Sequence, residues 1–449
     1  MTTALLPPGP PPVGFLGRIP CLIEFSRDQL GYMTRYARKY GDVVRMRGGK
    51  YPAYLVNRAD LIETVLLNKG GAFAKTENTP GARALQRVLG NGLLTSEGDF
   101  WLRQRRLVQP AFHRQRLLAY SQTMVEYTER MLETWRDGDT RDIHQAMMRL
   151  TLQIVAKTLF NADVTHHADR VGQALEAFMD RFANQAAIML LPENLPTPAN
   201  IRSQRAVERL DAIIYDIIRE RRDSGKDEGD LLSMLLHVQD EDGRFMSDHQ
   251  LRDEVVTLFL AGHETTALAL SWMFYLLAQI PDADAKLADE LRRVLGDGPL
   301  TADDLPKLSY TDAVVKEAMR LYPPAPRQAR QATADCELGG YRIPAGAIII
   351  VSQWVTQRDP RYFDHPDTFD PDRWLDGLER RLPRYAYFPF GAGPHMCIGS
   401  GFATMEANLL LACIARRFCL DLAPGQAIIP QVSVTLRPKH AIRMTLHAR

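Results

Sequence analysis

The 449-residue chain carries 55 basic and 54 acidic side chains, and its formal net charge at neutral pH is +1. This balance argues against a dedicated nucleic-acid-binding protein, which needs an excess of Lys and Arg. Hydrophobic residues make up 45% of the chain and no long low-complexity run interrupts it, so the composition indicates a globular protein with a large core.

Cysteine usage and the absence of targeting signals predict a cytoplasmic protein. The five cysteines are odd in number and match no metal-finger spacing, which indicates a reducing compartment without a disulfide framework. The start of the chain lacks the charged region and apolar run of a signal peptide. No stretch of about 18 uncharged apolar residues is present, so we expect no membrane span.

The N-terminal and strand-forming segments come first in chain order. A run of prolines predicts an extended lead-in over residues 1–20. The stretch DVVRMRGGKYPAYLV, residues 42–56, predicts a β-hairpin around Gly48-Gly49. ELGGYRIPAGAIIIV, residues 337–351, predicts a second hairpin, and residues 432–446 alternate in the same way. Strands from both ends and from the middle of the chain favour one interleaved domain over residues 1–449.

Helices account for most of the remaining chain. Residues 143–159 carry apolar side chains at helical spacing on two faces, which indicates a helix buried inside a large core. Ser247 and Gln250 form the capping-box pattern S-x-x-Q, and the helical pattern then continues to about Ile280, before Pro281. A helix of this length measures about 48 Å. The fold class predicted is therefore mainly α with a smaller β portion and a long central helix.

The middle of the long helix breaks the local rules of helix composition. It reads LFLAGHETTALAL, in which Gly262 and two adjacent threonines surround or follow an acid. These are poor choices for a helix interior, and threonine hydroxyls can bond back to earlier carbonyls and bend the helix. Residues that break local rules in this way often mark a functional site.

The stretch FGAGPHMCIG, Phe390 to Gly399, contains three possible iron ligands in a row: His395, Met396 and Cys397. No C-x-x-C-H attachment motif accompanies them. Cys397 lies where a glycine-rich loop meets an apolar helix, so its sulfur would face backbone N–H groups and the positive end of the helix dipole. Both lower the pKa of a thiol. The alternative is a small buried thiol, the interpretation that fits Cys413 and Cys419.

Four further motifs accompany this loop in a fixed order. The loop matches F-x-x-G-x-x-x-C-x-G, in which Gly393 and Gly399 would let backbone approach the sulfur or a flat macrocycle. The others are W-x-x-x-R at Trp101 and Arg105, AGHETT at 261–266, E-x-x-R at Glu317 and Arg320, and PDTFDPDRW at 366–374. Together they resemble the cytochrome P-450 family of haem-thiolate monooxygenases, over essentially the whole chain after the proline-rich lead-in. The resemblance implies a single domain in which haem b, iron protoporphyrin IX, is buried against the loop and Cys397 is the metal ligand.

The resemblance also assigns residues around the haem. It implies propionate contacts from Trp101, Arg105, Arg330 and His395, where the family usually has Arg at the last position. It places Phe390, Gly391, Gly399 and Ala261 beside the cofactor. For Arg105 a solvated helix face is the alternative, since Arg103 and Arg106 flank it.

Catalysis and substrate binding are implied at the central helix and the segments near it. Glu264 and Thr265 match the family's acid–alcohol pair, which supplies protons during oxygen activation; His263 is a relay or a bystander. Leu94, Ala261 and Ala325 fall at substrate-facing positions, with plain core packing as the alternative for Leu94. The segment Ala186–Pro198 matches a region that is a mobile lid in the family.

Glu317, Arg320 and Arg373 match a buried ion cluster of the family. Buried charges must be paired, and the planar guanidinium of Arg suits a carboxylate. We expect this cluster to have a structural role on the side of the core that carries the haem loop.

The reaction implied is the insertion of one oxygen atom from O2 into a hydrophobic substrate, by hydroxylation or epoxidation of a fatty acid or terpenoid-like molecule. Electrons would come from an external ferredoxin or flavodoxin with its NAD(P)H reductase. Such a partner would dock on arginines near the cysteine side, with scattered surface arginine as the alternative: Arg103, Arg106, Arg114, Arg116, Arg380, Arg381 and Arg384.

Two other functions fit the same family resemblance. They are a peroxide-driven enzyme and a non-catalytic haem carrier or gas sensor. The pair Glu264 and Thr265 favours the O2-dependent monooxygenase over both, because peroxide-driven members typically lack this pair and a carrier would not need it.

Overall fold

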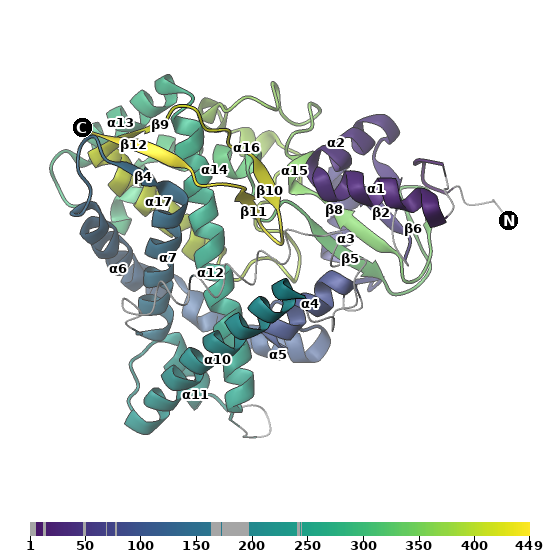
Figure 1. Cartoon of the computed structure of the whole chain (residues 1–449), viewed down its shortest axis with the longest axis horizontal. Coiled ribbons are helices and arrows are strands. Elements are labelled where there is room, and N and C mark those ends of the chain that lie inside the picture. The colour runs from purple at the N-terminus through teal and green to yellow at the C-terminus, as the bar shows by residue number, and fades with distance from the viewer. Residues whose placement is uncertain are drawn as a thin grey trace.

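A 30-residue helix, α12 (Asp248–Leu277), runs through the middle of the molecule (Figure 1). Its side chains are buried on almost all faces, and it packs against helices from both halves of the chain. The computed structural model describes residues 6–11, 15–47, 51–68, 70–76, 79–162, 172, 197–239, 243 and 245–449. Within these residues the fold is mainly α with a smaller β portion, as predicted.

The other α-helices of the described residues surround α12 or cover the main sheet. They are α1 (Phe15–Arg27), α2 (Gln29–Tyr40), α3 (Ala59–Leu67), α4 (Pro80–Leu89), α5 (Gly98–Val108), α6 (Arg114–Leu132), α7 (Ile143–Phe160), α10 (Pro198–Ser224), α11 (Leu231–His237), α13 (Pro281–Leu295), α14 (Ser309–Leu321), α15 (Gln353–Thr356), α16 (Leu378–Arg381) and α17 (Ser400–Arg417). Short 3-10 helices are η1 (Gln109–Phe112), η2 (Ala302–Lys307) and η3 (Pro371–Trp374).

The strands form one five-stranded sheet and three smaller ones. The large sheet has the order β1 (Val43–Met46), β2 (Ala53–Val56), β8 (Ile348–Val351), β5 (Gln328–Ala332) and β3 (Phe73–Ala74). The three-stranded sheet is β4 (Thr140–Asp142), β12 (Arg443–Ala448) and β9 (Phe418–Leu422), and the two-stranded ones are β6 (Cys336–Leu338) with β7 (Tyr341–Ile343) and β10 (Pro430–Val432) with β11 (Leu436–Pro438).

The sheets join segments that are far apart in the sequence. In the large sheet β2 pairs in parallel with β8, and β4 pairs with the C-terminal strand β12. Figure 1 shows the N-terminal segments beside this sheet on one side and most of the long helices on the other. The helix predicted over residues 143–159 is α7, and its buried side chains lie on more than one face, as expected.

Three predicted boundaries are wrong. The extended lead-in was predicted to residue 20, but α1 begins at Phe15, because the proline run ends at Pro12 and the single Pro20 is accommodated within the helix. Over residues 337–351, the hairpin is only β6 and β7, which turn at Gly339 and Gly340 with positive φ angles of 61° and 82°. The apolar run of β8 enters the large sheet instead.

The third boundary is the end of α12. Ser247 caps its start by accepting a hydrogen bond from the Gln250 amide at 3.2 Å, as predicted, but the Gln250 side chain donates to Glu254 and not back to the cap. The helix ends at Leu277 and not at Ile280. Ile280 precedes a proline and is therefore pushed out of helical geometry, and Pro281 begins α13.

Two predictions from composition can be compared with the described residues. All five cysteines are free, which agrees with the absence of a disulfide framework. In the part of the chain that the structure describes, no helix combines the length and apolarity that a membrane span requires. The turn of the first hairpin, residues 48–50, lies outside the described residues.

Candidate functional site

The loop that carries Cys397 is pinned against the end of α3. The Cys397 amide donates to the Phe390 carbonyl at 3.0 Å, which closes the loop. Gly391 and Gly393 have positive φ angles of 71° and 69°, and a β-carbon at Gly393 would lie 2.1 Å from the Leu66 carbonyl oxygen. Glycine is therefore needed at position 393 for close approach to α3, and its predicted role in approach to the sulfur or to a flat macrocycle stays a prediction. At Gly399 a β-carbon would make only an ordinary contact with Phe112.

The Cys397 thiol lies at the N-terminal end of α17, where the Gly399 N–H donates to its sulfur. This N–H and the nearby Arg105 lower the pKa of the thiol, but burial has the larger effect and raises the pKa above its ordinary value. The N–H group acts in the predicted direction, but desolvation, which is not visible in the sequence, outweighs it. A metal cation at the sulfur would reverse this balance, because a coordinating thiol loses its proton.

Cys397 is solvent-accessible and yet deep among protein atoms. A side chain with both properties lines a hollow inside the molecule. Residues predicted to face the haem or the substrate share this accessibility: Ala261 on α12 is exposed, Ala325 is partly exposed, and 45% of Leu94 is exposed. The accessibility of Leu94 argues against its alternative as a core residue.

His395 is held away from the sulfur and beside Trp101. Its ring centroid lies 4.0 Å from that of Trp101, and its Nε2 lies 3.1 Å from a Glu97 carboxylate oxygen. Its second ring nitrogen, Nδ1, is buried and has no hydrogen-bond partner. A buried nitrogen without a partner is costly, so a hydrogen-bonding group would fit here. Because Nε2 donates to Glu97, Nδ1 donates in turn only when the ring is protonated, and burial lowers the pKa of His395.

Three further cations gather around Trp101 and Glu97. Lys75 Nζ and the Arg105 guanidinium lie 5.5 and 5.7 Å from the Trp101 ring centroid, and Arg330 is close enough to lower the pKa of Lys75. Burial lowers the pKa of all three side chains, that of Lys75 to about 8. Such a concentration of desolvated positive charge fits the two carboxylates of a haem.

Lys75 was missed by the sequence analysis. Its ammonium group donates to the carbonyls of Leu93 at 3.2 Å and of Ser96 at 2.8 Å. These bonds tie the segment that carries Leu94 to the cation cluster. In the sequence Lys75 is a single lysine that follows the short strand β3, and no neighbouring residue distinguishes it from a lysine on the surface.

The rule-breaking segment of α12 continues as an unbroken helix. The Thr265 hydroxyl donates to the Ala261 carbonyl one turn earlier, at 2.7 Å. Both residues face accessible space, since Ala261 is exposed and Thr265 is partly exposed. The hydroxyl of Thr265 therefore lies on the same accessible face of α12 as Ala261.

Glu264 points away from that face. Its side chain is only 1% exposed, and its Oε1 accepts hydrogen bonds from Arg437 Nε at 2.6 Å and Thr435 Oγ1 at 2.8 Å. Both partners lie at the C-terminal β10–β11 hairpin. His263 is also buried, its Nε2 has no hydrogen-bond partner, and burial lowers its pKa to about 4. Glu264 is thus held as an ion pair, and His263 is neutral.

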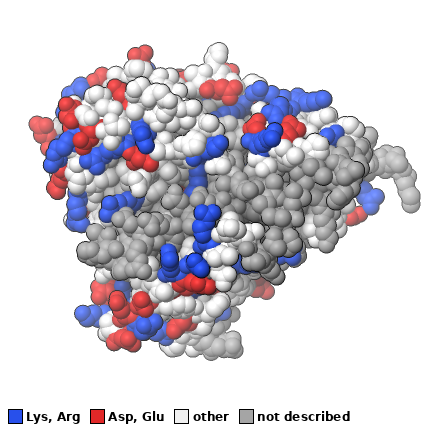
Figure 2. Space-filling view, viewed as in Figure 1, with Lys and Arg blue, Asp and Glu red and all other residues white. Residues whose placement is uncertain are grey.

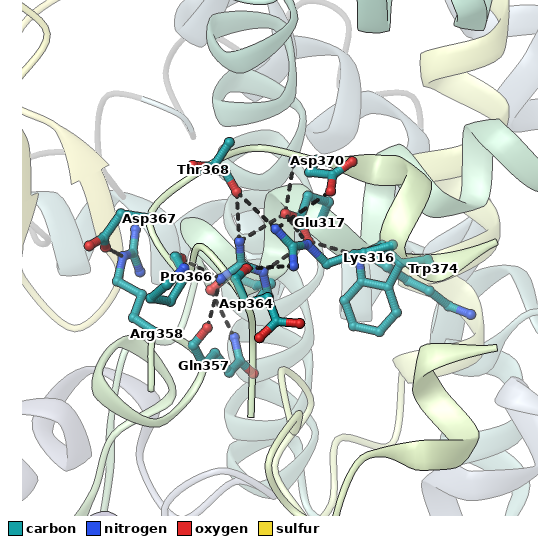
Figure 3. Close-up of polar contacts among 12 residues, drawn as sticks. Lys316, Glu317, Gln357, Arg358, Asp364, Pro366, Asp367, Thr368, Asp370 and Trp374 are labelled. Carbon is teal, nitrogen blue, oxygen red and sulfur yellow. Dashed lines mark hydrogen bonds and ion pairs between the residues drawn. The ribbon is translucent and has the colours of Figure 1, made fainter. Parts of the chain in front are cut away.

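Glu317, Arg320 and Arg373 meet in the core beside α14, as Figure 3 shows for Glu317 and its surroundings. Glu317 accepts five hydrogen bonds: two from Arg320, and one each from Arg373, the Trp374 indole and the Asp370 amide. Arg320 also donates to the carbonyls of Gln357, Pro366 and Thr368. The cluster therefore fastens the segment 357–374 to α14.

Glu406 is a second buried acid that the sequence analysis missed. It lies on α17, and neither carboxyl oxygen has a partner of good hydrogen-bond geometry, although Thr266 of α12 is near enough to lower its pKa slightly. Burial raises the pKa of Glu406 to about 8, so the group is protonated at neutral pH. The sequence indicates this buried acid in one way, since Glu406 is an acidic residue within an otherwise apolar helix.

Charge on the surface is mixed. On the face shown in Figure 2, basic and acidic side chains are interspersed. Of the arginines predicted to receive a redox partner, Arg116 donates to the Gly229 carbonyl and Arg103 is partly exposed. The other five are exposed: Arg106, Arg114, Arg380, Arg381 and Arg384. Of the segment predicted as a lid, residues 186–196 lie outside the described residues, and Pro198 begins α10.

Comparison with known proteins agrees with this geometry. The family model Cytochrome P-450 matches residues 7–444. The chain is 38% identical to cyclooctat-9-en-7-ol 5-monooxygenase of Streptomyces melanosporofaciens, over 87% of this chain and 84% of that protein. It is 39% identical to cyclooctatin synthase of the same organism, over 90% and 88%. It is 36% identical to pentalenene oxygenase of Streptomyces avermitilis, over 95% and 94%.

The Glu317 cluster predicts a large stability cost when its carboxylate is removed. Glu317→Gln leaves Arg320 as an uncompensated buried charge and leaves Arg373 with the more distant Asp370 at 3.8 Å, so we expect the free energy of unfolding to fall by roughly 3–5 kcal/mol. Asp289→Asn breaks an exposed pair with Arg292 and should cost less than about 1 kcal/mol. Urea unfolding of both variants measures the difference, and equal small losses would contradict the structural role.

The buried acid Glu406 predicts a pH dependence of stability. Its pKa is about 8 in the folded chain and near 4.5 when unfolded, so between these values only the folded state holds the proton. Its contribution to stability is complete below pH 4.5 and is lost as pH rises to 8, by up to about 1.4 kcal/mol per pH unit. Glu406→Gln should flatten this decline. Glu220→Gln, at an exposed position on α10, should leave it unchanged.

Proposed function

The chain belongs to the cytochrome P-450 family of haem-dependent monooxygenases, and on that premise we propose that its substrate is a terpenoid. The proposal draws on relatives whose names describe the oxidation of cyclooctatenol and pentalenene. It also draws on the apolar side chains of Leu94 and Ala261, which are accessible although large apolar residues are usually buried.

The placement of Cys397 supports the proposal most. Its sulfur accepts the Gly399 N–H at the start of α17, and the cation cluster lies alongside through the bond from Arg105 to the Met396 carbonyl at 2.9 Å. The cysteine that would bind the iron and the side chains that would bind the propionates are therefore joined by hydrogen bonds. Lys75, Arg105, Arg330 and His395 would hold the propionates, and the Trp101 ring contacts Lys75, Arg105 and His395.

Haem b, when bound, supplies the iron at which O2 is activated. The residues of the chain control protons and access. Thr265 would hold a proton for the reacting oxygen atom, once its hydroxyl turns from the Ala261 carbonyl toward the accessible face. Glu264 would be the acid that returns a proton to Thr265. For this, the hydrogen bonds from Arg437 and Thr435 to Glu264 must break, or these partners must pass the proton on.

We further propose an external ferredoxin or flavodoxin, with an NAD(P)H reductase, as the source of electrons. Five exposed arginines offer positive charge to an acidic carrier: Arg106, Arg114, Arg380, Arg381 and Arg384. Free cysteines suit a reducing compartment, so we place the protein in the cytoplasm.

Turnover under labelled oxygen tests the function directly. The haem-loaded protein would be incubated with cyclic terpenes and terpene alcohols, a ferredoxin and its reductase under ¹⁸O2. We expect one labelled oxygen atom in the product. Product that forms only when hydrogen peroxide is supplied, or product whose inserted oxygen atom is unlabelled, would contradict an O2-dependent monooxygenase.

Removal of the Thr265 hydroxyl predicts uncoupled turnover. Thr265→Ala should bind haem and substrate. Most of the electrons supplied should nevertheless reduce O2 to hydrogen peroxide, because no hydroxyl directs protons to the reacting oxygen atom. Thr265→Ser keeps a hydroxyl and serves as the control. The measurement is product formed per NAD(P)H consumed, and a ratio in Thr265→Ala equal to that of the unaltered protein would exclude the proton role.

The substrate pocket is tested by enlarging its proposed walls. Leu94 is largely exposed, so Leu94→Phe should escape the usual overpacking cost of about 1–3 kcal/mol for a core position. The ring should instead crowd the pocket and change the position of oxidation, and Ala325→Leu should act from another side. Melting temperature and product distribution are measured together. A large drop in melting temperature with unchanged products would assign both residues to packing.

A further inference from the structure

Arg327 is a deep guanidinium on the segment that leads from the proposed pocket into the large sheet. It follows Ala325 by two residues and directly precedes β5, the strand that carries Arg330. The segment is fixed in place, because the Pro326 carbonyl accepts hydrogen bonds from the Ser352 hydroxyl at 3.0 Å and the Trp354 amide at 3.1 Å. The position of Arg327 is therefore set by a rigid backbone.

Arg327 meets no carboxylate. Its Nη2 donates to the amide oxygen of Gln29 at 3.1 Å, and its guanidinium lies 6.0 Å from the Phe25 ring centroid. Its Nε is buried without a hydrogen-bond partner. Within the described residues, Arg327 takes part in no ion pair. Gln29 accepts from one of its five N–H donors, and the buried Nε–H has no acceptor among the described residues.

Other deep arginines of the described residues are paired with acids, apart from Arg330, which we assign to the haem propionates. Arg320 and Arg373 share Glu317, Arg437 binds Glu264, Arg221 binds Asp230, and Arg252 binds Asp211 and Asp253. This pairing follows the general cost of burying an isolated charge. Arg327 departs from the pattern, which calls for an explanation beyond packing.

The propionate cluster does not supply that explanation. Lys75, Arg105, Arg330 and Glu97 influence one another, whereas burial alone lowers the pKa of Arg327 and no charged group contributes. The side chain is nevertheless partly solvent-accessible. It therefore stands apart from the cations assigned to haem, and it can be reached by a small molecule.

We propose that Arg327 binds the carboxylate of the substrate, so that this enzyme oxidises an apolar acid such as a terpenoid carboxylic acid. The planar guanidinium matches a carboxylate in geometry. Because no second cation acts on Arg327, the site suits a single negative charge and not a diphosphate. The inference rests on the proposed function, since it places the acid at one end of the pocket that Ala325 borders.

Imidazole-terminated alkanoic acids of graded chain length, and their methyl esters, test the proposal. The imidazole binds haem iron, so an optical titration of the haem-loaded protein gives the dissociation constant without turnover. We expect the acid of optimal length to bind about tenfold more tightly than its ester. Arg327→Gln should abolish this preference and leave ester binding unchanged. Arg38→Gln, at an exposed position on nearby α2, should preserve it.

Melting temperature provides a second, independent readout. If Arg327 serves a ligand, Arg327→Met removes an unpaired buried charge, and the substrate-free protein should melt at the same or a higher temperature. A drop of several degrees, or equal weakening of acid and ester by Arg327→Gln, would assign Arg327 to packing and overturn the proposal. No acid preference in the unaltered protein, with neutral terpenes still oxidised, would overturn the carboxylate assignment and leave the proposed function standing.

Discussion

Burial of charge is the constraint on which the rest of this structure depends. A charged group that leaves water must meet an opposite charge or give up its charge by gaining or losing a proton. Glu317 follows the first course with two arginines, and Glu264 does so with Arg437. Glu406 follows the second course and stays protonated. The ion pairs of Glu264 and Glu317 fix α12 and α14 relative to the segments that pack on them.

The proposed haem site departs from this pairing of charges because it has an excess of positive charge. Lys75, Arg105 and Arg330 present positive charge, and Nδ1 of His395 lacks a hydrogen-bond partner among the described residues, with Glu97 as the carboxylate that contacts His395. The thiol of Cys397 meets the Gly399 N–H at the start of α17. Haem carries two carboxylates and a metal cation, so it satisfies the cation cluster and the thiol together. Arg327 is the remaining excess charge, and a substrate anion would satisfy it in the same way.

Motifs predicted the parts of the site in which short spacing determines geometry. Glu317 and Arg320 are three residues apart on one helix, so their contact follows from helical periodicity. Cys397 at the start of a helix, and the capped start of α12 at Ser247, are equally local. The long buried helix α7 followed from its apolar pattern.

The remaining features depend on residues that meet only in the folded chain. Arg437 reaches Glu264 across 173 positions, and the β10–β11 hairpin that brings them together has no motif. Lys75 and Arg327 look like ordinary surface cations until their burial is known. The effect of burial on the pKa of Cys397 also arises only in the folded chain, where it outweighs the helix end. Optical absorption of the reduced, carbon-monoxide-bound protein tests whether Cys397 is the iron ligand. We expect the red-shifted band of a thiolate ligand and its loss in Cys397→Ser. A histidine-type band, or a thiolate band that survives in Cys397→Ser, would contradict this assignment.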